Sequence, residues 1–193
     1  YRVLAIADGQ EPGFKGDAQN FLDELDPRYE FNLFTPEAGM IGGNEVVERY
    51  FYDGYSIITY FGHGSVMMWG KDRLFTAEDA RGLSNQDSPF LINMTCLTGL
   101  FTHPSSESIT EAFLFNPSGG SIAILAPTSM TLTLDQSLLS VALAHELSDT
   151  NNNRIGDIFL SAQRRVAVGS EGARDVLATF VLFSDPALVL FNR

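Results

Sequence analysis

Short apolar runs alternate with amphipathic segments along most of the chain. The apolar runs predict β-strands at residues 2–7, 31–34, 57–60, 90–93, 121–126 and 187–191. Helical spacing of apolar side chains predicts α-helices at residues 17–25, 44–52, 138–147 and 155–168, with shorter helices from residue 76 and from 108 to 115. Alternating strands and helices indicate a mostly parallel sheet with helices on both faces. We therefore predict an α/β fold, a three-layer αβα sandwich that forms one domain over residues 1–193.

Two short segments follow two neighbouring predicted strands and carry the most chemistry. In the first segment, His63 lies between two glycines, and the second contains Cys96, the only cysteine of the chain. The carboxyl ends of parallel strands meet at one edge of a sheet, where ligands bind. A thiol with an imidazole nearby is the minimum equipment for acyl transfer by a cysteine nucleophile.

Each of these residues also has a simpler interpretation. Cys96 could be a buried core thiol, although its place at a strand end favours function, and a helix beginning soon after it would favour the thiolate. His63 could be a surface histidine in a turn. Its flanking glycines, however, let the backbone adopt positive φ and let a substrate approach the main chain. The N–H groups of Gly64 and Cys96 could then hold an oxyanion.

Three further features suggest roles around this pair. Asp8 ends the first strand at the same edge and could orient His63 through a hydrogen bond, or it is an ordinary turn residue before a glycine. Residues 66–75 contain Trp69, and we expect them to form a loop or hairpin over the cleft. Residues 149–157 carry oxygen side chains at alternating positions, as in a calcium loop, but Leu160 stands where the final glutamate is required. A polar loop that caps the next helix is therefore the favoured interpretation, and we predict no metal ligands.

Composition excludes several function classes. The formal net charge of −12 argues against nucleic acid and anionic membranes as partners. No apolar stretch reaches the roughly 18 residues of a transmembrane helix, and a single cysteine excludes an internal disulfide framework. The chain enters its first strand without an initiator methionine or a signal peptide. We interpret it as a fragment of a longer protein.

A set of ordered motifs extends from about residue 3 to residue 191. His63 and Cys96 are 33 residues apart. The motifs, in chain order, are Tyr60-Phe61-Gly62-His63-Gly64-Ser65, Trp69-Gly70, Cys96-Leu97-Thr98-Gly99-Leu100-Phe101, Glu111-Ala112-Phe113-Leu114, Gly119-Gly120-Ser121-Ile122-Ala123-Ile124 and Phe180-Val181-Leu182-Phe183-Ser184-Asp185-Pro186. This order and spacing resemble the gingipain family, within the caspase-like clan of cysteine peptidases.

The resemblance implies a caspase-like fold and an endopeptidase that cleaves through a thioester. Cys96 would attack the scissile carbonyl, and His63 would protonate the leaving amine. The main-chain N–H groups of Gly64 and Cys96 would hold the oxyanion. Asp8 falls where gingipains place an acidic residue near the histidine.

Specificity is where the sequence departs from the family pattern. Gingipains prefer a basic residue before the cut, read by an acidic group in an early loop. Lys15 lies near that place, with Asp17 two residues on, and Lys15 would repel a basic side chain. The segment with Met130 and Leu132, which should line the same pocket, is small and apolar. We expect a neutral or apolar preference, with these four residues and Trp69 as substrate contacts.

The resemblance also implies the surroundings of the reaction. It implies a polypeptide substrate, a secreted or cell-surface location, an N-terminal subdomain or propeptide missing from this chain, and no required cofactor, with calcium at most as a structural ion. A processing or sorting transpeptidase would use the same dyad, transferring the acyl group to an amine. A catalytically silent caspase-like binding module is a second alternative. A flavodoxin-like ligand-binding domain is a third, but residues 7–10 are too short and acidic for its phosphate loop.

Overall fold

The computed structural model describes residues 1–151, 153–169 and 173–190. A six-stranded sheet forms its centre, in the order β2-β1-β3-β7-β8-β9. Its first five strands run parallel and the edge strand β9 is antiparallel to β8. The strands are β1 (Arg2–Ala7), β2 (Glu30–Phe34), β3 (Ile57–Phe61), β7 (Phe90–Met94), β8 (Ala123–Pro127) and β9 (Phe180–Phe183).

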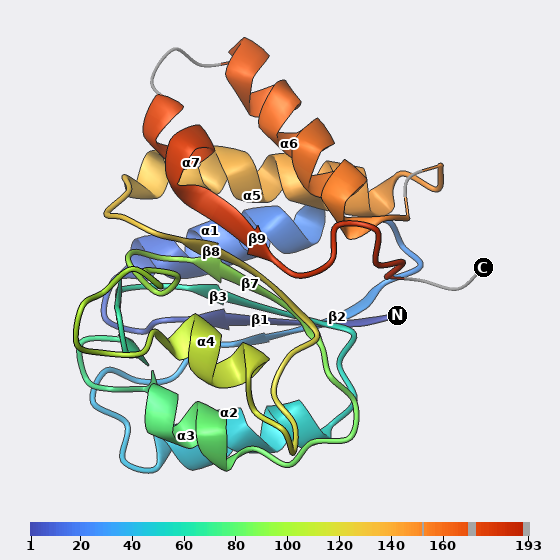
Figure 1. The fold of residues 1–193 in the computed structure, drawn as a ribbon. Helices are drawn as coiled ribbons and strands as arrows, with labels where there is room; N and C mark the ends of the chain where they lie inside the picture. The colour runs from blue at the N-terminus through green and yellow to red at the C-terminus, as the bar shows by residue number, and fades with distance from the viewer. Residues whose placement is uncertain (152, 170–172, 191–193) are drawn as a thin grey trace.

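Helices cover both faces of this sheet (Figure 1). One face carries α1 (Pro12–Asp23), α5 (Thr133–Ser148), α6 (Ile155–Gly169) and α7 (Arg174–Thr179). The other carries α2 (Gly43–Tyr52), α3 (Ala77–Gly82) and α4 (Ile109–Leu114). The predicted three-layer sandwich is confirmed. Among the described residues, no helix has the length and apolar character needed to cross a membrane.

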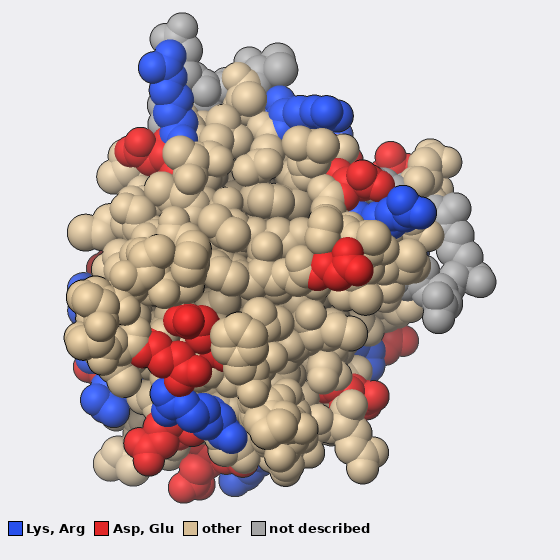
Figure 2. Space-filling view, viewed as in Figure 1, with Lys and Arg blue, Asp and Glu red and all other residues tan. Residues whose placement is uncertain are grey.

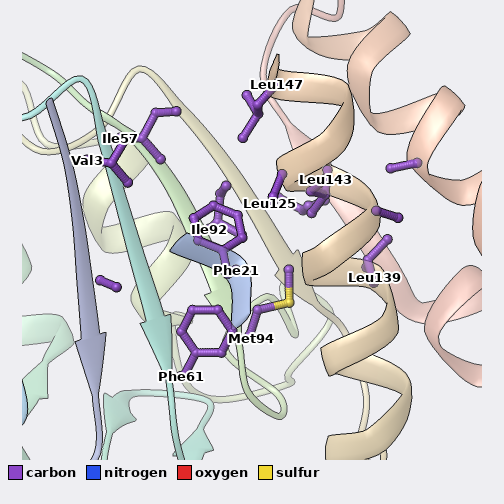
Figure 3. Close-up of a cluster of buried hydrophobic side chains, with 14 of the residues drawn as sticks. Val3, Phe21, Ile57, Phe61, Ile92, Met94, Leu125, Leu139, Leu143 and Leu147 are labelled. Carbon is purple, nitrogen blue, oxygen red and sulfur yellow. The ribbon is translucent and has the colours of Figure 1, made fainter. Parts of the chain in front are cut away.

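Alternate residues of the strands feed two separate cores. Val3, Ile57 and Ile92 belong to the cluster beneath α1 and α5, as Figure 3 shows. Their neighbours Leu4 and Ile58 belong to the cluster on the opposite face. A parallel sheet buried on both faces requires such near-continuous apolar strands, which is why the sequence pattern located them.

A second, three-stranded antiparallel sheet follows His63. It consists of β4 (Gly64–Ser65), β5 (Met68–Trp69) and β6 (Phe75–Thr76). Trp69 is 0% exposed, and its ring stacks on that of Tyr60 with centroids 4.6 Å apart and planes 5° apart. The prediction that Trp69 contacts substrate is therefore wrong, because aromatic packing buries it in the core.

Two predicted elements differ from the observed ones. The helix predicted at residues 17–25 begins earlier, at Pro12 of α1, since proline is well suited to the first helical turn. The late strand is β9, at Phe180–Phe183, whereas Val189 forms only an isolated bridge with Arg154. Residue 191 lies outside the described residues. The two short helices α3 and α4 begin as expected, each with a capping box in which a threonine or serine and an acidic residue satisfy each other's backbone N–H.

Candidate active site

Strand register brings the loops of His63 and Cys96 together. The last paired residues of β3 and β7 are Phe61 and Met94, so His63 and Cys96 each lie two residues beyond this pair. The N–H of Gly62 donates a hydrogen bond to the Met94 carbonyl oxygen at 3.3 Å. The two loops therefore leave the sheet side by side at its carboxyl edge.

Gly64 extends this contact past the histidine. A Cβ atom at this position would lie 2.3 Å from Thr95 Oγ1 and 2.9 Å from the carbonyl oxygen of Cys96. No real side chain tolerates such distances, so the backbone after His63 packs directly against the backbone at Cys96. Only glycine permits this approach.

The sulfur of Cys96 is partly exposed and lies beside the segment that follows β8. Its Sγ is 3.5 Å from the Thr131 carbonyl oxygen and 3.9 Å from Nε2 of Gln136. Gln136 is buried, and its amide also donates to the Thr95 carbonyl at 2.9 Å and to Thr131 Oγ1 at 2.6 Å. One side chain of α5 thus ties the cysteine loop to the next loop of the sheet, a role that sequence reasoning missed.

A tight turn follows the cysteine. Leu97 has a φ of 62°, which is rare for a residue with a side chain. Its N–H donates to the Ser129 carbonyl at 3.1 Å, and the N–H of Gly99 donates to the Pro127 carbonyl at 2.9 Å. Strained backbone of this kind is common at functional sites. The next helix along the chain, α4, begins only at Ile109, whereas the helix whose first turn contacts Sγ is α5, through Gln136.

The imidazole of His63 has a carboxylate partner. Its Nε2 lies 2.5 Å from Oε1 of Glu11, and Phe14 meets the ring edge-on with centroids 5.1 Å apart. The hydrogen bond with His63 is the main cause that lowers the pKa of Glu11, and Lys71, whose Nζ is 3.6 Å away, lowers it further. Glu11 is the N-cap residue of α1. Sequence reasoning missed it, although its place at the same sheet edge as Asp8 was a usable signal.

Asp8 holds the main chain of the histidine rather than its ring. Its buried carboxylate accepts hydrogen bonds from the His63 N–H at 3.3 Å and from the Gln10 N–H at 3.1 Å. The hydroxyl of Tyr60 donates to the His63 carbonyl at 2.7 Å, and burial raises the pKa of Tyr60 well above its usual range. Asp8 thus accepts a hydrogen bond from the backbone of His63, whereas the carboxylate on the imidazole is Glu11.

The remaining predicted substrate contacts lie on α1 and on the segment between β8 and α5. Met130 and Leu132 are 72% and 68% exposed and flank Thr131, whose carbonyl faces Sγ. Lys15 and Asp17 lie on α1, the helix that carries Phe14 to the imidazole. Within the described part of the chain, neither has a hydrogen bond or ion pair to His63 or Cys96.

Other charged groups do not form a further site. No cluster of three or more histidine, cysteine, aspartate or glutamate residues among those described is suited to a metal ion. In the polar segment 149–157, Asp149 accepts hydrogen bonds from the backbone and side chain of Asn151. On the face shown in Figure 2, acidic and basic side chains are interspersed over α3 and α4 rather than forming a basic field.

Comparison with known sequences yields a consistent set of relatives. The sequence model of Peptidase family C25 matches residues 2–191. Gingipain R2 and Gingipain R1 of Porphyromonas gingivalis are each 26% identical to this chain over 153 residues, or 72% of its length. The chain spans only 20% and 15% of those two proteins.

Solved structures share the fold over nearly the whole chain. The Arg-specific cysteine proteinase gingipain R superposes with a TM-score of 0.83 at 20% identity, covering 97% of this chain and 47% of that one. The separase of Saccharomyces cerevisiae, in complex with securin, has a TM-score of 0.64 at 14% identity, covering 95% of this chain and 11% of that one. The predicted caspase-like fold is confirmed.

Proposed function

The chain belongs to Peptidase family C25, and from that premise we propose that it is a cysteine endopeptidase domain whose dyad is Cys96 and His63. The observation that carries the proposal is the register of β3 and β7, which delivers the two residues side by side. The sulfur is partly exposed, and the imidazole is held from its Nε2 side by Glu11. This arrangement offers a nucleophile, a proton carrier and a group that orients it.

The reaction would proceed in two halves. The Cys96 thiolate attacks the scissile carbonyl carbon, and the oxyanion is held by the N–H groups of Gly64 and Cys96. The C–N bond breaks as His63 gives a proton to the departing amine, which leaves a thioester on Sγ. Water then attacks the thioester while His63 takes its proton. The acid product leaves, and the thiolate and the protonated imidazole are restored.

Glu11 defines which ring nitrogen can take part. Because Nε2 is paired with Glu11 at 2.5 Å, Nδ1 is the nitrogen left for proton transfer. A carboxylate on the far nitrogen holds the ring in one orientation and stabilises the imidazolium that the cycle requires. Asp8 also holds His63 in place, because its carboxylate accepts a hydrogen bond from the backbone N–H of His63.

The residue before the cut is proposed to be neutral or apolar. Met130 and Leu132 are exposed apolar residues on either side of Thr131, whose carbonyl contacts the sulfur, and apolar surface there favours apolar ligands. Lys15 adds a positive charge to the helix that contacts His63. The solved gingipain R is described as Arg-specific, so this specificity would differ.

The substrate class, the missing part of the protein and its location are proposed from the gingipain relatives. One of the matched structures is a complex of the pro- and mature domains of gingipain RgpB. This chain covers 48% of the chain that it matches there. We propose a polypeptide substrate, a further subdomain or propeptide, and a secreted or cell-surface location. A sorting transpeptidase would use the same thioester with an amine in place of water, and a silent binding module would keep the fold without turnover.

Labelling and turnover test the proposal together. A thiol-directed peptidyl inhibitor should modify Cys96 selectively, and a fluorogenic peptide library should be cleaved. Cys96→Ala and His63→Ala should each abolish cleavage, whereas turnover that survives Cys96→Ala would refute the dyad. Adding a primary amine separates the alternatives, because a transpeptidase forms the amide product. A strong preference for arginine would refute the assigned specificity.

A further inference from the structure

A groove lies along the small antiparallel sheet and begins one residue after Gly64, the residue that packs against Cys96. It has a volume of about 500 Å³ and is lined by Val66, Met67, Met68, Ala77, Arg73 and His103, among others. We refer to it as the Met67 groove. The lining starts at Ser65, two residues after His63, and includes His103 and Ser106 from the loop that follows Cys96. Both candidate catalytic loops therefore continue into the same groove.

The wall of the groove offers an apolar contact surface. Met67 is 45% exposed, while the neighbouring Val66 and Met68 are half-buried. Methionine is flexible and polarisable, so methionine-lined surfaces accept apolar side chains of different shapes. His103 lies in the same lining, and its buried Nδ1 has no hydrogen-bond partner among the described residues.

The order of the strands assigns a direction to the groove. Cys96 follows β7, which lies between β3, carrying His63, and β8, which leads to Thr131. The Thr131 carbonyl faces the sulfur from the β8 side. In the proposed reaction the departing amine must be reached by His63, so it leaves toward the β3 side. The segment that lines the groove is the direct continuation of that histidine loop.

Two charges in the groove are available to a ligand. Arg81 forms an ion pair with Glu107. Glu78, in the first turn of α3, and Arg73 are both exposed, and neither has an ion pair or side-chain hydrogen bond within the described part of the chain. Arg73 has a φ of 59°, a backbone conformation that few residues with a side chain adopt.

Resting on the proposed peptidase function, we infer that the Met67 groove binds the leaving-group half of the substrate polypeptide. It selects a large apolar side chain on the carboxyl side of the cut and, through Arg73, disfavours lysine and arginine and favours acidic residues. The groove is thus a second specificity site, separate from the surface formed by Met130 and Leu132.

Two kinds of substrate separate this inference from the proposed function. Internally quenched peptides share one acyl half and carry leucine, alanine, glutamate or lysine just after the cut. An aminocoumarin amide of the same acyl half has no residue on that side. Met67→Asp should lower the leucine-over-alanine preference by about tenfold and leave aminocoumarin turnover unchanged. Arg73→Asn, which tolerates positive φ, should lower the glutamate-over-lysine preference by roughly fivefold.

Matched controls and a binding measurement complete the test. Met40→Asp and Arg49→Asn alter exposed residues outside the groove and should change neither preference. Unchanged preferences in the groove variants, or equal losses on both kinds of substrate, would overturn the inference while the proposed function stands. If the wild-type protein cleaves none of these substrates, that result would instead count against the proposed function. In that event, fluorescence anisotropy of a labelled peptide with an amino-terminal leucine tests the inference. The peptide should bind the wild-type protein and not the Met67→Asp variant, and equal binding to both would refute the inference.

Discussion

Nε2 of His63 lies 2.5 Å from Oε1 of Glu11, a pair that joins the loop after β3 to the N-cap of α1. The pair links two residues that are 52 positions apart in sequence. Phe14, in the first turn of the same helix, packs its ring against the imidazole. The histidine is therefore positioned by α1 as much as by the strand that delivers it.

Removing this carboxylate should weaken catalysis without unfolding the domain. In Glu11→Gln the imidazole loses its charged partner, so we expect kcat to fall roughly tenfold, part of the 10²–10⁴ that general acid–base catalysis contributes. Steady-state kinetics with a fluorogenic peptide measures it. Glu24→Gln is the matched control, because Glu24 forms a similar carboxylate–imidazole pair with His145, with 3.1 Å between Oε2 and Nε2, and contacts neither His63 nor Cys96 among the described residues. Equal losses in both variants would contradict the role assigned to Glu11.

The titration of Glu11 gives a second, independent measurement. Its pKa is lowered from 4.5, chiefly by the hydrogen bond with His63. A lowered folded-state pKa means that the pair stabilises the folded protein above pH 4.5 and that this contribution is lost as the pH falls through the lowered value. Carboxyl ¹³C NMR should show a midpoint below 4.5 that returns toward 4.5 in His63→Ala. Lys71→Ala should shift the midpoint less, and a wild-type midpoint at or above 4.5 would contradict the pair.

Gly64 should tolerate no side chain. An added Cβ would meet Thr95 Oγ1 at 2.3 Å and the Cys96 carbonyl at 2.9 Å, so Gly64→Ala must push the two loops apart. We expect a loss of about 1–3 kcal/mol in the free energy of unfolding and a loss of activity of about a hundredfold or more. Denaturant unfolding and kinetics measure the two effects. Gly82→Ala is the control: nothing lies within 4 Å of its Cβ, and it should stabilise α3 by about 0.5–1 kcal/mol. Full activity in Gly64→Ala would show that the loops need no such contact.

Gln136 should stabilise the cysteine loop. Gln136→Leu keeps a similar volume but removes the only amide that donates to Thr131 Oγ1 among the described residues, and it leaves the Thr95 carbonyl with the Thr131 hydroxyl, at 3.2 Å, as its side-chain donor. The free energy of unfolding should fall by about 1–3 kcal/mol, and the rate of Cys96 alkylation should change because Nε2 also contacts Sγ. Gln163→Leu removes a comparable amide on α6, bonded to the Leu177 carbonyl, and should leave alkylation unchanged. An identical alkylation rate in all three proteins would refute the assignment.

The layers of the fold and the common sheet edge of the His63 and Cys96 loops were determined by the sequence alone. Buried strands such as Ile57–Phe61 and Phe90–Met94 are mostly apolar runs, a local signal that needs no knowledge of the rest of the chain. Once the sheet is parallel, the residues after two such strands must reach the same edge. This general rule, and no particular contact, brought the loops of His63 and Cys96 to the same edge.

Only the tertiary structure decided which side chains surround that pair. Glu11 reaches His63 from α1, whereas Gln136 and Thr131 reach Cys96 from α5 and the loop after β8. Trp69, in contrast, was predicted to contact substrate, but its ring stacks on Tyr60 and is buried. Periodicity reports which face of an element is apolar, but partners far apart in sequence depend on helix placement and loop conformation. These arise from the packing of the whole domain, so no local pattern could have named them.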